Sequence, residues 1–178
     1  MGKIIFLDID GVLNTKYWYS QMDRNTPKDQ YGYMFDPISV GNLAKIVRET
    51  GADIVISSSW KSLGLSTLLD MWSDRNMPGN IIDITPNSVS DELLLNANLD
   101  EFEITHIRGC EIKEWLETKG REVTHYAIID DMDNFLPEQQ SHFVWIDPNV
   151  GITEGNTVQV KMILNHLEHS PMATTIHK

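Results

Sequence analysis

The sequence predicts an α/β protein with a doubly wound parallel sheet, in a Rossmann-like order of strands and helices. Short runs of β-branched and aliphatic residues alternate along the chain with segments whose apolar residues recur at helical spacing. Several of these runs end in a carboxylate or hydroxyl residue, as strands do at the ligand-binding edge of such a sheet. A length of 178 residues, without an internal repeat or a low-complexity linker, fits a single domain.

Five apolar runs predict the strands. The first, "KIIFLDI" at residues 3–9, is continuous and β-branched, which is typical of a central strand buried on both faces. The others are "ADIVIS" at 52–57, "IIDIT" at 81–85, "YAIIDD" at 126–131 and "HFVWID" at 142–147.

Four segments predict helices, and the one that follows Asp36 has the clearest ends. Asp36 is a favourable N-cap, Pro37 suits the first helical position, and Gly51 ends the helix. The other predicted helices cover residues 65–72, 108–119 and 156–168.

The remaining segments predict the domain organisation. We expect one domain over residues 1–170, with a flap insertion at 15–35 directly after the first strand and a second short insertion at 86–106. The flap region has no clear periodicity but is rich in aromatic residues. Residues 171–178 are expected to form a flexible tail.

Composition excludes several classes of protein. With 26 acidic and 14 basic residues the formal charge is −12, so stable binding of long nucleic acid is not expected, although one local basic pocket remains compatible with that total. The single cysteine, Cys110, excludes a disulfide framework and a thiolate zinc cluster. No apolar stretch approaches the roughly 20 residues of a membrane span, so no membrane partner is expected and the chain is predicted to be cytoplasmic.

Polar residues follow three of the predicted strands where those strands end. Asp8 and Asp10 follow the first strand, Ser57 the second, and Asp130 and Asp131 the fourth. Because the carboxyl ends of parallel strands meet at one edge of a sheet, these side chains should lie together. Carboxylates in such a partly buried place need a partner, and a metal cation is one such partner.

Four motifs resemble, in order, those of the haloacid dehalogenase-like (HAD) superfamily: "DIDGVLN", "IVISSSW", "RGCEIKEWL" and "YAIIDD". The resemblance extends over about residues 3–150. Within it, the "SSSW" and "RGxEIxxWL" patterns are most similar to the phosphatase-type domain of RNA-repair proteins of the Swiss Army knife and polynucleotide kinase-phosphatase-like kind. A lone DxD would be a weak signal, whereas the ordered set of four motifs is specific.

The resemblance implies a role for each polar residue. Asp8 would be the nucleophile that forms an aspartyl-phosphate. Asp10 would act first as general acid and then as general base. Ser57 would hydrogen-bond a phosphoryl oxygen, and Arg108 would neutralise the transferring phosphoryl group.

The resemblance also implies a Mg²⁺ cofactor. Its ligands would be Asp8, the main-chain carbonyl of Asp10, and Asp130, with Asp131 either a direct ligand or one step behind. Oxygen ligands of this kind suit Mg²⁺, which offsets the charge of an anionic phosphate. Main-chain amides that begin at Gly11 could complete the phosphate site.

Two assignments stay open at this stage. Ser58 and Ser59 directly follow Ser57 and are further candidates for contact with the phosphate, because an offset of one residue reverses the face of a strand. Lys61 and Lys113 compete with Arg108 for the basic role.

The flap supplies candidate substrate-binding residues. Tyr17 and Trp18 directly follow the DxDG turn, and nucleobases stack on such rings. The alternative is that these aromatic residues pack the insertion against the body of the protein.

The sequence therefore favours a Mg²⁺-dependent phosphomonoesterase whose phosphorylated substrate is a nucleotide or a nucleic-acid end. The same chemistry on a small metabolite or a phosphoprotein is an alternative. A HAD fold kept only as a binding module is another, although neither Asp8 nor Asp10 is missing.

Overall fold

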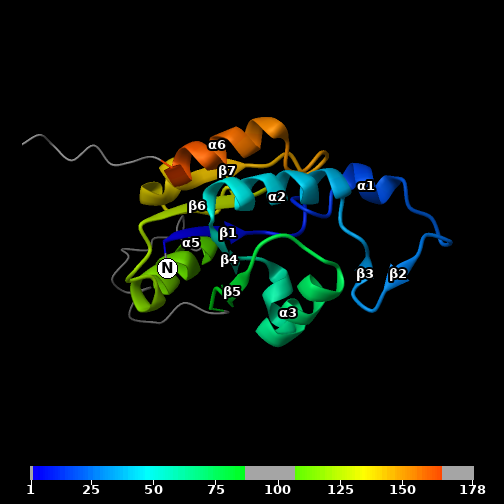
Figure 1. Cartoon of the computed structure of the whole chain (residues 1–178), viewed down its shortest axis with the longest axis horizontal. Coiled ribbons are helices and arrows are strands. Elements are labelled where there is room, and N and C mark those ends of the chain that lie inside the picture. The colour runs from blue at the N-terminus through cyan, green and yellow to red at the C-terminus, as the bar shows by residue number, and fades with distance from the viewer. Residues whose placement is uncertain (1, 87–106, 166–178) are drawn as a thin grey trace, which may run out of the picture.

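The computed structural model describes residues 2–86 and 107–165, so the predicted insertion at 86–106, apart from its first residue, and the predicted tail at 171–178 lie outside the described residues. A five-stranded parallel sheet forms the centre of the described part (Figure 1), and a flap with one short helix and a two-stranded hairpin follows its first strand. The sheet contains β1 (Lys3–Leu7), β4 (Asp53–Ile56), β5 (Ile81–Ile84), β6 (His125–Asp130) and β7 (Phe143–Trp145). The α-helices are α1 (Lys16–Ser20), α2 (Pro37–Thr50), α3 (Leu65–Asp74), α5 (Ile107–Lys119) and α6 (Glu154–Asn165).

The strand order confirms the predicted doubly wound sheet. The order is β5-β4-β1-β6-β7, with every neighbouring pair parallel. Along the chain, β4 and β5 are placed in turn on one side of β1, and β6 and β7 are then placed in turn on its other side. Strand order therefore reverses between β1 and β6, which is where ligands bind in sheets of this type.

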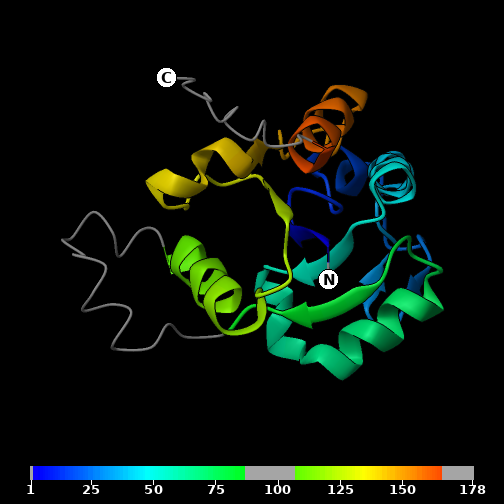
Figure 2. The same ribbon diagram turned by 60° about the vertical axis from the view of Figure 1, so that its left-hand side comes forward.

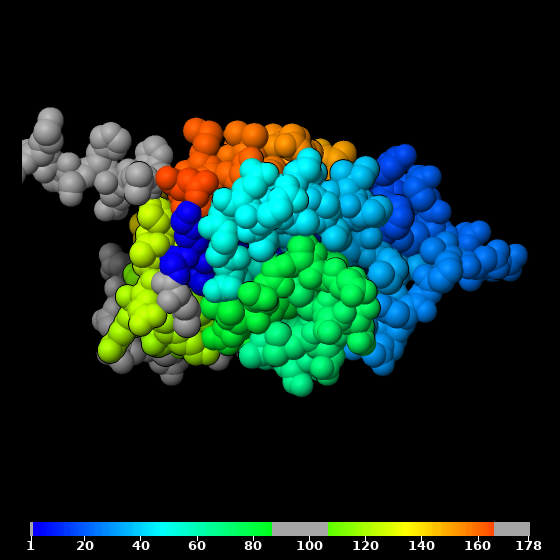
Figure 3. All heavy atoms as spheres, viewed as in Figure 1, coloured from blue at the N-terminus to red at the C-terminus, as the bar shows by residue number. Residues whose placement is uncertain are grey.

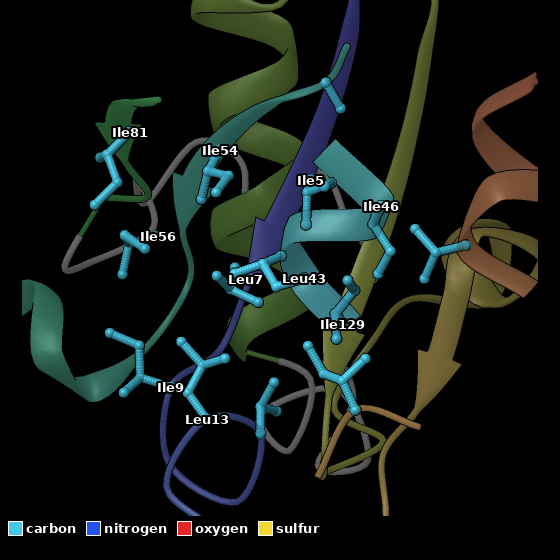
Figure 4. Close-up of a cluster of buried hydrophobic side chains, with 14 of the residues drawn as sticks. Ile5, Leu7, Ile9, Leu13, Leu43, Ile46, Ile54, Ile56, Ile81 and Ile129 are labelled. Atoms are coloured by element: carbon cyan, nitrogen blue, oxygen red, sulfur yellow. The ribbon is translucent and has the colours of Figure 1, made fainter. Parts of the chain in front are cut away.

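Both faces of the sheet are buried, as the continuous apolar runs predict. Ile5 and Leu7 of β1 point toward Leu43 and Ile46 of α2 (Figure 4). The alternate residues of β1, including Phe6, belong to the second core cluster together with Trp115 of α5. Figure 2 shows α2 and α6 on one side of the sheet and α5 on the other. Among the described residues, no helix has the length and apolar character needed to cross a bilayer.

The ends of α2 confirm the capping residues predicted from the sequence. The Asp36 carboxylate accepts a hydrogen bond from the Ile38 amide at 2.9 Å, and Pro37 occupies the first turn. Gly51 adopts a φ of 68°, a left-handed conformation that favours glycine and ends the helix.

The flap has local structure that the sequence pattern does not predict. It contains α1 and a hairpin of two very short strands, β2 (Lys28–Asp29) and β3 (Gly32–Tyr33). Two 3₁₀ helices, η1 (Ser59–Leu63) and η3 (Pro137–His142), are also unpredicted. Figure 3 shows the flap at one end of the molecule, beside α3.

Arg75 ties the flap to the end of α3. Its Nε and Nη2 atoms each donate to an oxygen of Asp29 at 2.7 Å, and its side chain is only 1% exposed. The guanidinium carbon also lies 4.5 Å from the ring centroid of Phe35 and 5.7 Å from that of Tyr31. A paired charge between aromatic rings thus supports a hairpin too short to be stable alone.

We expect Arg75→Met to loosen the flap while the sheet stays folded. Methionine fills a similar volume but loses both bonds to Asp29, which should reduce local stability by about 1.5–3 kcal/mol. Limited proteolysis should then cut residues 15–35 faster than in the wild type, with little change in far-UV circular dichroism. Arg24→Met, which removes an exposed arginine of the same flap, is the matched control. Equal cleavage rates in all three proteins would contradict the assignment.

Candidate active site

The turn after β1 carries Asp8 and Asp10 on opposite sides of a buried residue, Ile9. Asp8 is 4% exposed, whereas Asp10 lies at the surface of the turn. The Ile9 carbonyl accepts from the amides of Leu13 and Asn14, at 2.8 and 3.1 Å, and these bonds close the turn. The turn therefore holds one carboxylate inside the sheet edge and one at its rim.

The end of β6 brings two further carboxylates next to Asp8. In the parallel ladder Leu7 pairs with Ile129, so Asp8 and Asp130 follow at the same level of adjacent strands. Each of Asp8, Asp130 and Asp131 offers one carboxylate oxygen, and these oxygens all lie within 4.8 Å of one another. The predicted convergence of these three residues at one edge is thus present.

Gly11 makes room for this cluster. Its φ of 75° is a conformation that favours glycine. A Cβ atom added here would also overlap the carboxylate of Asp131. Any other residue at this position would force the Asp131 carboxylate to move.

Arg108 is the cation that reaches the carboxylates. Its Nη1 atom lies 3.2 Å from Oδ2 of Asp8 and also forms an ion pair with Asp130. Gly109 allows this approach, because a Cβ there would come within 2.7 Å of the Leu136 amide nitrogen. At the start of α5, Arg108 therefore supplies the charge, and Gly109 supplies the close packing that positions Arg108.

One arginine leaves the cluster with excess negative charge. Burial raises the pKa of Asp8, and the nearby Arg108 opposes that shift. Burial, with a further contribution from the charge on Asp8, raises the pKa of Asp130 to about 7. Burial also raises the pKa of Asp131. A divalent cation fits an oxygen-only donor set of this charge, and Mg²⁺ is the common choice for such ligands.

Asp10 is held by a separate set of donors. The indole Nε1 of Trp60 lies 3.0 Å from each of its carboxylate oxygens. The Ser59 hydroxyl lies 3.3 Å from Oδ2, and the Asn14 amide donates to Oδ1 at 3.0 Å. These donors fix Asp10 near the cluster, and Asp10 forms no ion pair within the described part of the chain.

The two predicted serines occupy different environments. The Ser58 hydroxyl lies close enough to the Asp8 carboxylate to lower the pKa of Asp8, and its oxygen accepts from the Trp60 amide at 3.4 Å. The Ser57 hydroxyl is buried and has no hydrogen-bond partner within the described part of the chain. Ser57 therefore keeps a free hydrogen-bonding group, whereas Ser58 already contacts Asp8.

The lysines that compete with Arg108 have other partners. The Lys61 ammonium lies 2.5 Å from the Glu111 carboxylate and 2.6 Å from the Pro86 carbonyl oxygen. Lys113 lies 3.7 Å from Glu138. The structure thus brings neither lysine to the carboxylates.

The flap contributes to the site through different residues from those that the sequence singles out. Tyr17 is 63% exposed, and the Trp18 indole donates to the Met34 carbonyl at 2.8 Å. Neither residue lines the cavity over the carboxylates, whereas Lys16 and Tyr19 do.

The cavity itself has a volume of about 380 Å³. Asp8, Asp10, Arg108 and Asp131 all line it, together with Ser59. It is of a size that admits a phosphate group with part of the molecule that carries it.

Comparison with protein families identifies the type of domain. Residues 4–157 match the family described as the HAD domain in Swiss Army Knife RNA repair proteins. The chain belongs to this family. Comparison with curated proteins and with solved structures gives no match.

Membership of this family links the acidic cluster to metal binding. HAD domains are generally metal-dependent phosphatases, and this HAD domain has three carboxylates close enough to hold a metal ion. The family match confirms the resemblance found in the four sequence motifs.

Four residues at the site of this HAD domain carried weak or no signals in the sequence. Lys16 follows the DxDG turn closely but stands in a region without periodicity. Trp60 lies in the "SSSW" motif, yet the motif does not reveal that its indole reaches Asp10. Ser59 is the last of three adjacent serines that the sequence does not distinguish, and Tyr19 is one of several aromatic residues of the flap.

Asp131→Asn tests whether the cluster is adapted to a cation. Because the fold raises the pKa of Asp131, its ionised form is disfavoured without metal. In excess chelator the variant should therefore melt at the same temperature as the wild type or higher. In Mg²⁺ the wild type should gain more stability than the variant, and each 1 kcal/mol of difference corresponds to roughly 2–4 °C.

The matched control is Asp133→Asn, which removes a carboxylate two residues away that accepts from Gln140 at 2.8 Å. This control should keep the full Mg²⁺ response. A variant at Asp131 that melts lower in chelator and responds fully to Mg²⁺ would contradict a role in cation binding.

Proposed function

We propose that this HAD domain is a Mg²⁺-dependent phosphomonoesterase that works through an aspartyl-phosphate on Asp8 and acts on the terminal phosphate of a nucleotide or nucleic acid. The single observation that carries the proposal is the separation of two aspartates in one turn. Asp8 lies among carboxylates and Arg108, whereas Asp10 is held apart by neutral donors. Nucleophilic and acid–base roles require such different surroundings.

Asp8 is suited to attack phosphorus. In the first step an oxygen of Asp8 forms a bond to phosphorus while the bond to the leaving oxygen breaks. Arg108, 3.2 Å from Asp8, lies where it can balance the negative charge of the transferring group. Lys16, which lines the same cavity, adds a second positive charge nearby.

Asp10 is suited to move the proton. It gives a proton to the leaving oxygen in the first step and takes one from the attacking water in the second. The second step breaks the bond between phosphorus and Asp8, and it releases inorganic phosphate. Trp60 and Ser59 keep the Asp10 carboxylate at the rim of the cavity, where the leaving group and the water must both pass.

Asp8, Asp130 and Asp131 would hold Mg²⁺, with the Asp10 carbonyl as a further oxygen ligand. The bound ion would supply charge neutralisation and align the phosphate oxygens. Without it, the anionic cluster would repel an anionic phosphate.

The family description supports a nucleic-acid-related substrate, since it names RNA-repair proteins. The formal charge of −12 argues against an extended contact with a polynucleotide. A single terminal phosphate is compatible with both observations, because it would contact only Arg108, Lys16 and the bound cation in a small cavity and would leave no further phosphates against the acidic surface.

Asp8→Asn should abolish turnover without loss of the fold. Asparagine keeps the size of the side chain but is a far weaker nucleophile, so release of phosphate from a generic aryl phosphate should fall at least 10³-fold. Circular dichroism and the melting temperature report on folding. A folded variant with wild-type activity would refute the nucleophilic role.

Chelation should abolish activity, and Mg²⁺ should restore it. Ca²⁺ is larger and accepts looser geometry, so it should bind but support little turnover. Phosphate release measured with each ion in turn checks this expectation, with thermal shift as a record of binding. Full activity in excess chelator would exclude a metal role for the cluster.

A further inference from the structure

A second hollow adjoins the catalytic cavity on the side of Asp10. It lies between the β2–β3 turn of the flap and the η1–α3 segment, and its volume is about 610 Å³. Ser59 lines both hollows, so they meet at this residue. The residues that line this groove include Gln30, Tyr31, Ser59, Trp60, Ser62 and Thr67.

Trp60 connects the groove to the chemistry. Its indole N–H contacts both oxygens of Asp10, while the same residue lines the groove. In the proposed reaction Asp10 gives its proton to the leaving oxygen. The part of the substrate attached to that oxygen must therefore extend past Asp10, and the groove begins there.

The groove is suited to a ring-bearing and neutral group. Tyr31 and Trp60 supply aromatic surface, and several hydroxyl and amide groups supply hydrogen bonds. None of the residues that line it is a lysine or an arginine. Lys61, although it lies between two lining residues in sequence, is paired with Glu111.

Negative charge lies beside the groove. The Asp74 carboxylate accepts hydrogen bonds from Gln30 and from the Tyr31 hydroxyl, each at 3.3 Å. A second phosphate in this groove would approach that carboxylate, which is unfavourable, because Arg75, 5.7 Å from the Tyr31 ring, is already paired with Asp29.

The wall of the groove is fixed before a substrate arrives. The Tyr31 amide donates to Asp29 at 2.8 Å, and Asp29 is paired with the buried Arg75. Because the ring is attached to an anchored turn, little conformational entropy should be lost when a base packs against it.

We propose that this groove binds the leaving group of the substrate and that this group is a nucleoside without a second phosphate. The proposal rests on the proposed phosphomonoesterase function and narrows it: nucleoside monophosphates are the preferred substrates, over nucleoside bisphosphates and polynucleotide ends.

Tyr31→Leu tests the aromatic wall. The measurement is kcat/KM for a nucleoside 5′-monophosphate divided by kcat/KM for glycerol phosphate, which has no ring. Loss of one stacking surface should lower this ratio roughly 5- to 150-fold. Leu69→Ala, an exposed change on α3 outside the groove, should leave the ratio unchanged. An unchanged ratio in Tyr31→Leu, or equal loss on both substrates, would overturn the groove assignment while turnover of glycerol phosphate still supports the phosphomonoesterase.

Ser62→Lys tests the charge of the groove. The wild type should prefer a nucleoside 5′-monophosphate over the corresponding 3′,5′-bisphosphate. A lysine in the groove should raise relative activity on the bisphosphate by roughly 2- to 5-fold, the size expected for an exposed charge pair. Ser66→Lys adds the same charge to α3 at an exposed position that does not line the groove. An equal gain in both variants, or a wild type that prefers the bisphosphate, would overturn the inference.

Direct binding separates failure of the groove from failure of the enzyme. If the wild type hydrolyses neither compound, the proposed function fails and the groove is judged by calorimetry with adenosine alone. Adenosine that binds the wild type and binds Tyr31→Leu at least 5-fold more weakly supports the groove. Adenosine that binds neither protein, or both equally, overturns it.

Discussion

The close approach of three carboxylates at the β1–β6 edge is the constraint on which the rest of the site depends. Asp8 and Asp130 are forced together by the register of adjacent parallel strands. The residues around these carboxylates serve to make room for them and to offset their charge. Gly11 leaves space for the third carboxylate, and Arg108 is brought in at the start of a helix. The sheet would not need these features for its own stability, which is why they indicate function.

The second constraint is that Asp10 must stay out of this cluster. One residue, Ile9, separates it from Asp8 along the chain, yet among the described residues it shares none of the ion pairs of Asp8. Apart from Asn14 in the same turn, its described partners come from η1, which follows β4, so the turn after one strand is completed by the segment after its neighbour. Trp60 is central here because a single side chain both orients the proposed proton donor and forms a wall of the adjoining groove. In the proposed reaction, Trp60 would therefore contribute both to proton transfer by Asp10 and to binding of the leaving group.

Much of the fold could be predicted because its signals are local. The buried runs that form β1 and β6, and the caps at Asp36 and Gly51, depend on residues close in sequence. The local structure of the flap could not be predicted, since its hairpin depends on the pairing of Asp29 with Arg75, 46 residues away. Within the site, the position of polar residues at the ends of predicted strands was enough to predict which side chains meet at the sheet edge. It could not decide among nearby cations, because the choice depends on side-chain partners such as the one that Lys61 finds in Glu111.

The negative charge of the whole chain and the two cations that line the candidate site act over different distances. A formal charge of −12 repels polyanions over about a Debye length, roughly 8 Å at physiological ionic strength. Arg108 and Lys16, by contrast, face a cavity of about 380 Å³ in which screening by solvent is weaker. A compact monoester has one charged group, which enters the cavity directly. A polynucleotide would keep most of its phosphates outside, against an acidic surface. Asp74 beside the uncharged groove would act in the same direction as this contrast. The protein would then distinguish substrates mainly by the size and charge of the leaving group, because every substrate presents the same phosphate.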